Sequence, residues 1–332
     1  MLFYCFKRLL GMVPVFFGVT LLSFFIIQLA PGKPTDRLTD LNPRITPEAR
    51  ARLEQYYGLD KPIIIQYVAW LSRVVRFDFG TSFSSDARPV LEKIWDRSVP
   101  VLDRRLMVTF LINVISFVLI MIVAVPVGVL AAYRPHSWID RITSVVVFVG
   151  FAAPKFWIAL LLMMLFSVTL GWFPISGIKS LHYASLSETA QYLDRLRHLA
   201  LPVFVSACGG IAGISRYLRA SMLETLSSDF IVTARAKGLP ESTVVFRHAL
   251  RNALLPIITL LGLSVPGFVA GSVIFETIFG IPGMGQLSYQ AIMMRDYPVI
   301  MGLLCITALL TMIGNLIADV CYAYSDPRIR MR

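Results

Sequence analysis

Charged residues are scarce in this chain of 332 residues: they make up 15% of it, compared with about 25% in an ordinary soluble domain. Hydrophobic residues make up 56%, which is more than the core of a soluble protein of this length can bury. The two values exclude the usual soluble classes. We therefore predict an all-α polytopic membrane protein, with apolar helices of about 20 residues that cross the bilayer.

Cysteine and histidine are also rare, with four of each. The cysteines lie in or beside apolar segments, and no metal-binding His/Cys spacing occurs, so we predict neither a disulfide framework nor a metal site. The sequence contains no GxxxxGK[ST] string for ATP phosphates, no HExxH motif and no Ser/His/Asp grouping. We accordingly predict no catalytic residue, no cofactor bound by this chain and no enzyme activity of its own.

The basic residues give the chain a net charge of +11. In a soluble protein such a charge would suggest nucleic acid as a partner. Here the basic residues flank apolar segments, where they orient the protein in the membrane and attract anionic lipid. We therefore predict the lipid bilayer as a partner and no nucleic acid.

Six apolar segments are long enough to cross the bilayer, which places both termini in the cytoplasm. No small-x-small cleavage site follows the first segment, so we interpret it as a retained helix and not as a signal peptide. The predicted spans are residues 9–30, 106–133, 142–170, 199–218, 254–275 and 299–322. The predicted divisions are a first helix (1–30), a helical outer loop domain (31–105), a five-helix core (106–322) and a tail (323–332).

Residues 31–105 form a long polar region, and a loop of this length crosses the membrane regardless of its charge. Thr46 to Gly58 is typical of one helix, which begins with a capping residue and a proline and ends at a glycine. Pro62 to Phe77 predicts a second helix with its apolar residues three and four positions apart. These apolar residues are Ile63, Tyr67, Trp70, Leu71 and Val74.

The stretch from Ser228 to Pro256 is polar and basic, and it lies between two apolar segments. It predicts a short helix from Asp229 to Lys237, because a glycine follows where a helix end favours positive φ. A Leu-Pro turn and a second helix come next. The small side chains of Ala234 and Ala236 would allow another protein to approach this helix closely, with cationic side chains beside them.

This stretch resembles the EAA loop of ABC-importer permeases, in its dipeptide/oligopeptide/nickel form. The Glu-Ala-Ala of the general pattern is replaced by Val232-Thr233-Ala234, as is usual in the peptide-type subfamily. The resemblance implies that residues 228–251 form a cytoplasmic coupling loop, whose helix lies in a groove of the ATPase; an ordinary basic loop is the alternative. The implied coupling residues are Thr233, Ala234, Arg235, Ala236, Lys237, Gly238 and Leu239, with His248-Ala249-Leu250-Arg251-Asn252-Ala253 downstream.

Similar strings occur in family order along nearly the whole chain, including the first helix, the outer loop, residues 275–285 and the tail. They imply a type I ABC-importer permease fold in the inner membrane of a bacterium or archaeon. The implied partners are a second homologous permease subunit, two cytoplasmic ABC ATPase subunits that hold ATP and Mg, and an external substrate-binding protein. The implied cargo is peptide, with nickel chelates, glutathione or sugars as alternatives.

Two outer segments, residues 59–82 and 276–285, are expected to touch the external binding protein or to gate the outer mouth. The glycines and prolines of the second segment predict a tight turn and no helix. The alternative for the first segment is a helical cap that only packs on the membrane helices. The candidate contacts are Asp78, Gly80, Glu276, Pro282 and Gly283.

Lys155 lies near the middle of the predicted third span, directly after Pro154, where a bend is expected. A lysine at mid-membrane costs about 2.5–3.5 kcal/mol on insertion scales, so it should face protein or water. We expect it to face the translocation path. The alternatives are that it pairs with an acid or carbonyl groups of a neighbouring helix, or that it extends to an interface.

An ion-coupled secondary transporter is a second class with six spans. Such transporters use intramembrane acids as ion relays and often contain an inverted repeat. Only Asp319 and Glu276 are candidates for such acids, and no repeat is visible. An intramembrane enzyme is a third class, for which no catalytic grouping is present.

Overall fold

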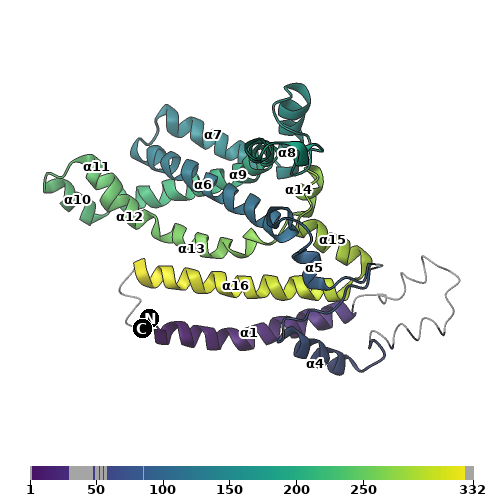
Figure 1. Ribbon diagram of the computed structural model, residues 1–332. Helices are drawn as coiled ribbons and strands as arrows, with labels where there is room; N and C mark the ends of the chain where they lie inside the picture. The colour runs from purple at the N-terminus through teal and green to yellow at the C-terminus, as the bar shows by residue number, and fades with distance from the viewer. Residues whose placement is uncertain are drawn as a thin grey trace. The chain divides into compact units, whose positions relative to one another are not determined.

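The structure is a computed structural model that describes residues 2–29, 48, 52, 55, 58–84 and 86–325. Every regular element in these residues is helical, which confirms the all-α prediction (Figure 1). The α-helices are α1 (Leu2–Leu29), α4 (Ile63–Val74), α5 (Val90–Ile94), α6 (Arg105–Tyr133), α7 (Trp138–Ala152), α8 (Lys155–Met163), α9 (Glu188–Leu226), α10 (Asp229–Ala236), α11 (Glu241–Thr243), α12 (Leu250–Ala253), α13 (Leu255–Ser264), α14 (Val273–Ile278), α15 (Met284–Met294) and α16 (Tyr297–Ser325). Segments Met164–Thr169 and Val244–Ala249 are π-helical.

In the described part of the chain, four helices are long and apolar enough to cross a membrane, or five if one bent helix pair counts as a single span. The bent pair is Glu241–Ala253 with Leu255–Ser264, at an angle of 42°. Helices α6 and α16 coincide closely with the predicted second and sixth spans. The four helices are Phe6–Leu29, Arg105–Tyr133, Glu188–Leu226 and Tyr297–Ile317.

The predicted third span, 142–170, is two helices instead of one. Helix α7 ends at Ala152, and α8 begins at Lys155. Pro154 lies between them with ψ of 132°, outside the helical region. Because proline lacks an N–H, it cannot continue the backbone ladder of α7. The predicted bend is therefore a complete break, and Lys155 starts a helix and does not lie within one.

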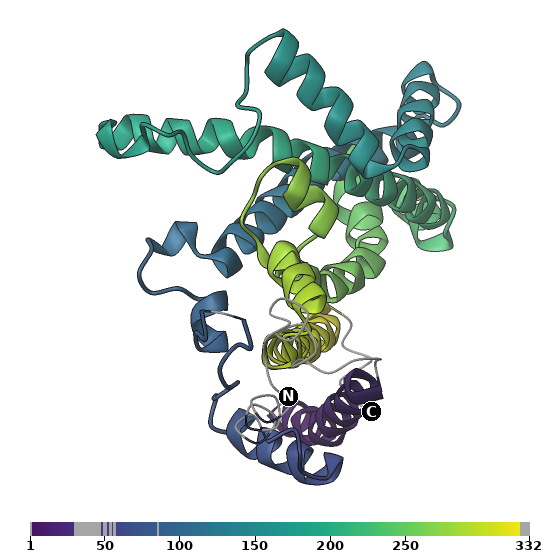
Figure 2. The same ribbon diagram turned by 90° about the vertical axis from the view of Figure 1, so that its right-hand side faces the viewer.

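The predicted fourth span, 199–218, lies inside a longer helix, because α9 has 39 residues from Glu188 to Leu226 (Figure 2). Hydropathy identifies only the apolar middle, while polar turns at both ends continue the same helix. Ser187 precedes its first turn, where serine is a favoured capping residue, and Glu188 suits the positive end of the helix dipole.

The predicted fifth span, 254–275, is interrupted after Ser264 by a 3₁₀ turn at Pro266–Phe268. The expectation of a turn without helix over 276–285 was also partly wrong, because α14 continues to Ile278 and α15 begins at Met284. The turn between them contains Gly280 with φ of +60°. A positive φ favours glycine, which explains why the chain can reverse at this position.

The outer loop contains the second helix that the apolar spacing predicts, as α4. Tyr67, Trp70 and Val74 are its buried residues, so the predicted apolar face is confirmed for these three. The predicted helix from Thr46 to Gly58 and the end of the tail, 326–332, lie largely outside the described residues.

The chain forms two compact units. In the first, α4 packs on α1: the rings of Phe24 and Tyr67 are 5.5 Å apart, and the Tyr67 hydroxyl lies 3.1 Å from the Thr20 hydroxyl. The first unit is Met1–Val108, Val269–Val273 and Pro282–Ile313, and the second is Thr109–Phe268, Ile274–Ile281 and Gly314–Arg332.

In the second unit, α6 packs tightly on α9 through glycine. A Cβ atom on Gly210 would lie 2.2 Å from Cδ1 of Ile120, and one on Gly128 would lie 3.0 Å from Cβ of Leu218. Small residues let helix backbones approach closely in membrane proteins. Gly210 of α9 and Gly128 of α6 therefore allow these two helices to approach closely.

Candidate functional site

Helix α10 forms where the sequence predicts it and ends within one residue of the predicted end. Gly238 follows with φ of +76°, a conformation that strains any residue with a side chain. The Gly238 N–H donates to the Arg235 carbonyl at 2.9 Å, and the Leu239 N–H donates to the Ala234 carbonyl at 3.4 Å. These bonds close the last helical turn, so the glycine fixes both the end of α10 and the exit of the chain.

The inner face of α10 belongs to the core of its own unit. Ile231 is 0% exposed and Ala234 is 7% exposed, and both belong to a buried apolar cluster that also contains Leu218 and Met222 of α9. Ala234 is small because α10 approaches its own chain here. This corrects the expectation that Ala234 lies open to another protein. The residues are three positions apart, so they share one face of the helix.

The outer face of α10 is exposed and combines apolar and cationic side chains. Phe230 is 45% exposed and Val232 is 58% exposed. We call this set the α10 face: Phe230, Val232, Thr233, Arg235, Ala236, Lys237 and Leu239. An apolar face beside cations, on a helix that is anchored from behind, suits contact with another protein. Of the two alanines, Ala236 is the one that is open to an approaching surface.

An exposed ion pair links α10 to α11. The Arg235 guanidinium donates to both Glu241 carboxylate oxygens, at 2.7 and 3.2 Å. These hydrogen bonds hold the pKa of Glu241 below its usual value of 4.5 and raise that of Arg235. The pair spans the Gly238–Pro240 turn, so it restrains the angle between the two helices, although an exposed pair contributes little to stability.

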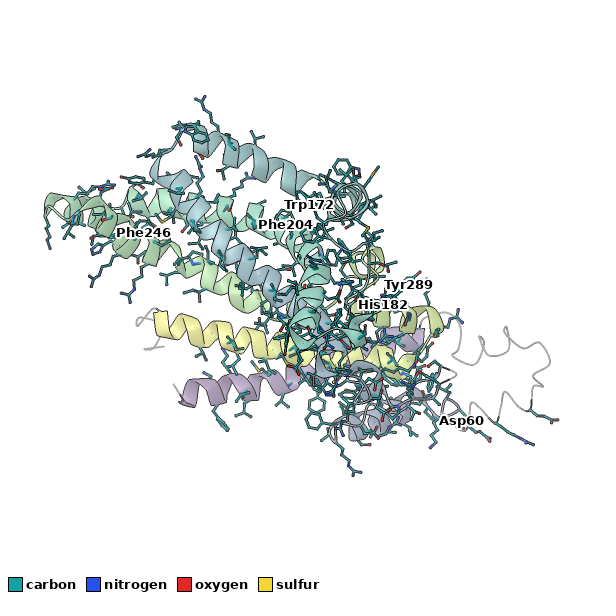
Figure 3. All side chains as sticks on the ribbon, turned by 45° about the horizontal axis from the view of Figure 1, so that its top comes forward. Asp60, Trp172, His182, Phe204, Phe246 and Tyr289 are labelled. Carbon is teal, nitrogen blue, oxygen red and sulfur yellow. The ribbon has the colours of Figure 1, made fainter. Side chains whose placement is uncertain are left out.

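The chain beyond α11 is π-helical over Val244–Ala249. Val244, Val245 and Ala249 are buried in the same cluster as Ile231, whereas Phe246 remains 61% exposed. Figure 3 shows the Phe246 side chain on the α10–α12 segment. Single-turn π segments often occur at functional sites, and this one adds an exposed aromatic ring near α10.

Lys155, the predicted path residue, is the first residue of α8 and is exposed within its unit. Its Cε atom lies 3.2 Å from where a Cβ atom of Gly209 would be, so the lysine stem crosses α9 at a glycine. No carboxylate in the described residues forms an ion pair with it. The stem is thus held against α9, while the exposed ammonium group remains available.

The five predicted outer contacts have different surroundings. Asp78 is exposed, and its carboxylate accepts the Gly80 N–H at 2.9 Å, in a turn where Gly80 has φ of +82°. Pro282 is half-buried, but Gly283 is buried. Glu276 is only 4% exposed and accepts a hydrogen bond from Thr109 at 3.2 Å. The side chain of Glu276 therefore belongs to the interior of its unit, which does not fit the expected surface contact.

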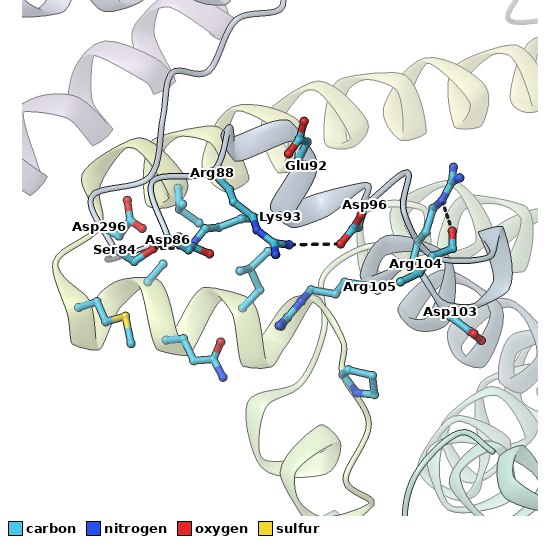
Figure 4. A pocket seen from close by; sticks show the side chains of 17 residues that line it. Ser84, Asp86, Arg88, Glu92, Lys93, Asp96, Asp103, Arg104, Arg105 and Asp296 are labelled. Carbon is cyan, nitrogen blue, oxygen red and sulfur yellow. Dashed lines mark hydrogen bonds and ion pairs between the residues drawn. The ribbon is translucent and has the colours of Figure 1, made fainter. Parts of the chain in front are cut away.

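The first unit contains a charged pocket of about 430 Å³ that sequence reasoning missed (Figure 4). Lys93 pairs with Asp86 at 2.9 Å, and Arg88 pairs with Asp96 at 3.5 Å. Burial raises the pKa of Asp86, but hydrogen bonds from Ser84 and Lys93 outweigh it and lower that pKa. The Ser98 hydroxyl and N–H lower the pKa of Asp96.

Asp296, which also lines this pocket, is 2% exposed and holds the loop between α4 and α5. Its carboxylate accepts hydrogen bonds from the Ser82 hydroxyl and, at 3.0 Å, from the Phe83 N–H. Arg295 before it has φ of +52°, which turns the chain at the end of α15. Asp296 is far in sequence from the residues that it holds. The string Arg295-Asp296-Tyr297-Pro298 was therefore the only sequence feature that could have drawn attention to this contact.

Two family models match the chain in succession. Residues 124–331 match "Binding-protein-dependent transport system inner membrane component", and residues 1–105 match the N-terminal membrane component of such systems. The chain is 44% identical to the oligopeptide transport system permease protein AppB of Bacillus subtilis, over 98% of both chains. It is 35% identical to the dipeptide transport system permease protein DppB of Alkalihalophilus pseudofirmus, over 99% of this chain and 100% of the relative. It is 37% identical to the di/tripeptide permease protein DppB of Pseudomonas aeruginosa, over 99% of each.

Proposed function

Because the chain belongs to the family of binding-protein-dependent transport system inner membrane components, we propose that it forms half of the translocation path of an ATP-driven peptide importer. The observation that carries this proposal is the full-length similarity to peptide permeases, which includes the segment that forms α10 and its exposed face. The family and the apolar helices make the chain a multi-pass membrane protein and a transport component.

We propose the six-span arrangement with both termini in the cytoplasm. Helices α1, α6, α9 and α16 supply four spans, the bent pair that ends at Ser264 supplies one, and α7 with α8 supplies the sixth. Residues 31–105 then form the outer loop domain, 106–322 the five-helix core and 323–332 the cytoplasmic tail. The membrane is the inner membrane of a bacterium or archaeon.

The partners we propose are a second permease subunit, two cytoplasmic ATPase subunits and an external substrate-binding protein. The ATPases hold ATP and Mg, and this chain binds no cofactor. The α10 face is the contact with an ATPase, because its apolar residues are exposed while its inner face is anchored in the core. The turn at Asp78 and Gly80, with Pro282, is the outer contact. Nickel chelates, glutathione or sugars are the alternative cargoes.

Reconstitution tests the proposal directly. The chain is co-expressed with a second permease, the ATPases and the binding protein of the same organism, purified, and placed in liposomes that enclose ATP, with the binding protein and peptide outside. We expect the ATPases to co-purify, and peptide uptake to require ATP and the binding protein. Uptake that follows an imposed ion gradient without ATP would instead support a secondary transporter.

We also propose that Lys155 faces the path, where its cation eases the passage of a peptide carboxylate. Lys155→Met keeps the length of the side chain and removes its charge. Uptake of peptides with a free C-terminus should then fall more than uptake of C-terminally amidated peptides. Equal loss for both, or loss of assembly, would show that the lysine has a structural role.

A further inference from the structure

An ion pair with a buried carboxylate and a partly exposed guanidinium joins α7 to α9 in the second unit. Asp140, in the first turn of α7, is 4% exposed. The Arg219 guanidinium on α9 donates through Nε to one carboxylate oxygen at 2.6 Å and through Nη2 to the other at 2.7 Å. Two parallel bonds of this kind fix the orientation of both side chains as well as their separation.

The turn before α7 holds the carboxylate in place. The His136 N–H donates to Asp140 at 3.0 Å, and the Asp140 N–H donates to the Ser137 hydroxyl at 3.3 Å. His136 has φ of +64°, a left-handed conformation that histidine adopts more readily than most residues. Asp140 is therefore oriented by its own turn before it meets the arginine, and the pair ties a rigid corner of the chain to α9.

Stability alone does not explain this pair. Apolar residues of similar volume often replace a buried ion pair with no loss of stability, because removing two charges from water is costly. What the bidentate pair adds is a fixed geometry between two helices. Helix α7 also packs on α9 more extensively than on any other helix in the described chain, so the pair sets the register of an already large contact.

Arg219 lies on the part of α9 that carries α10. Its neighbour Leu218 and the residue one turn later, Met222, are 0% exposed and belong to the same buried cluster as Ile231 and Ala234 of α10. The segment Val244–Ala249, which contributes to that cluster, packs on both α9 and α10. Helix α9 continues without a break to Leu226, and two residues separate it from α10. A displacement of α10 must therefore move the end of α9 at which Arg219 is anchored.

We propose that the Asp140–Arg219 pair is a positioning element of transport, which makes α7 move with α9 when an ATPase displaces α10. Helix α7 leads to the break at Pro154 and so to Lys155, whose stem also lies on α9. The pair thereby links the α10 face to the helix that carries the proposed path residue. This inference rests on the proposed function.

The test uses the complete transporter in liposomes and measures peptide imported per ATP hydrolysed. Arg219→Lys keeps the charge but loses the two parallel bonds, and Asp140→Asn keeps the shape but loses the charge. Each should lower uptake per ATP by about fivefold or more. The amount of assembled complex and the basal ATPase rate should persist. The matched control, Arg197→Lys at an exposed arginine of the same helix, should leave the ratio unchanged.

A covalent link between the two positions distinguishes two explanations for a loss of uptake. Either the pair positions α7 on α9, or its charges contact the ATPase directly. In a chain without its native cysteines, the D140C/R219C variant is joined by a short bifunctional thiol reagent. Restored uptake per ATP supports the inference, and a tie that restores nothing overturns it. An unchanged ratio in Arg219→Lys also overturns it. If the unmodified transporter imports no peptide with ATP, the proposed function itself fails.

Discussion

The segment Asp229–Ala253 and the segment Gly80–Asp96 are both polar stretches beside apolar helices, but different forces hold them. The first lies on buried apolar side chains and leaves its cations exposed. The second is held by ion pairs and by the carboxylate of Asp296. Apolar burial is non-directional and is not weakened by charge screening, whereas ion pairs depend on geometry and are screened by salt.

The difference indicates different mechanical roles. A helix anchored by an apolar cluster transmits a force from its exposed face to the core beneath it, because close-packed interiors deform little. A loop held by hydrogen bonds can exchange them for contacts with another protein at small cost, since each bond is worth about 1 kcal/mol net. We therefore associate the α10 segment with force from an ATPase and the outer segment with a reversible encounter.

The largest expected effect is that of Ala234→Asp, which breaks the apolar anchor of α10. The new carboxylate would be buried among Leu218, Met222 and Ile231 without a partner of opposite charge. An uncompensated buried charge costs about 3–5 kcal/mol. Thermal unfolding in detergent should show a clear loss of stability, together with a lower yield of folded protein. A melting temperature equal to that of the unmodified protein would contradict the burial of this face.

The next largest effect concerns the polar anchor of the outer segment. Asp296→Ala removes the acceptor of the Ser82 hydroxyl and the Phe83 N–H, at a cost of about 1–3 kcal/mol. Backbone amides between α4 and α5 should then exchange hydrogen faster, as measured by mass spectrometry. Arg88→Ala, which removes an exposed pair, should change this exchange little, because such pairs contribute about 0–1 kcal/mol. An equal increase in hydrogen exchange in both variants would contradict the claim that Asp296 holds this segment more firmly than the exposed ion pair does.

A moderate effect is expected from Ala236→Asp, the same substitution as the first but on the exposed face of α10. The protein should fold with an unchanged melting temperature, while ATP-driven uptake falls by about tenfold, equivalent to about 1.4 kcal/mol of contact free energy. Co-purification of the ATPases and uptake are measured on the same samples. Normal uptake would show that the α10 face carries no contact.

The smallest effect is expected from Gly238→Ala, which tests the geometry of the exit from α10. The space around Gly238 is open, so only the backbone strain at φ of +76° matters, and that costs about 1 kcal/mol. Gly213→Ala is the control, because Gly213 lies in the helical backbone of α9 with open space around it. Chemical unfolding should show that the first variant is less stable than the second.

Local signals explain what the sequence could predict. The end of α10 follows from the glycine after it, and the buried face of α4 follows from its apolar spacing. The ends of α9 could not be found by hydropathy, because its polar turns are helical but not apolar. The break at Pro154 was foreseen as a bend, since proline marks the position but not the angle.

The features that the sequence did not predict depend on contacts between distant parts of the chain. Ala234 was placed on the wrong side of α10, because a small residue is equally suited to an inner or an outer close contact. Glu276 was placed outside, because nothing in its own segment indicates its contact with Thr109. The Asp140–Arg219 pair joins residues 79 positions apart, so the sequence alone could not reveal it.

Cysteine crosslinking tests most directly the claim that the outer face of α10, and not its inner face, meets the ATPase. In a chain whose four native cysteines are replaced by alanine, single cysteines are placed at Ala236 and at Ala234. The assembled transporter also carries single cysteines along the proposed groove of the ATPase. We expect a disulfide with the ATPase from position 236 and none from position 234. A crosslink from 234 alone, or from neither position in any nucleotide state, would contradict the account.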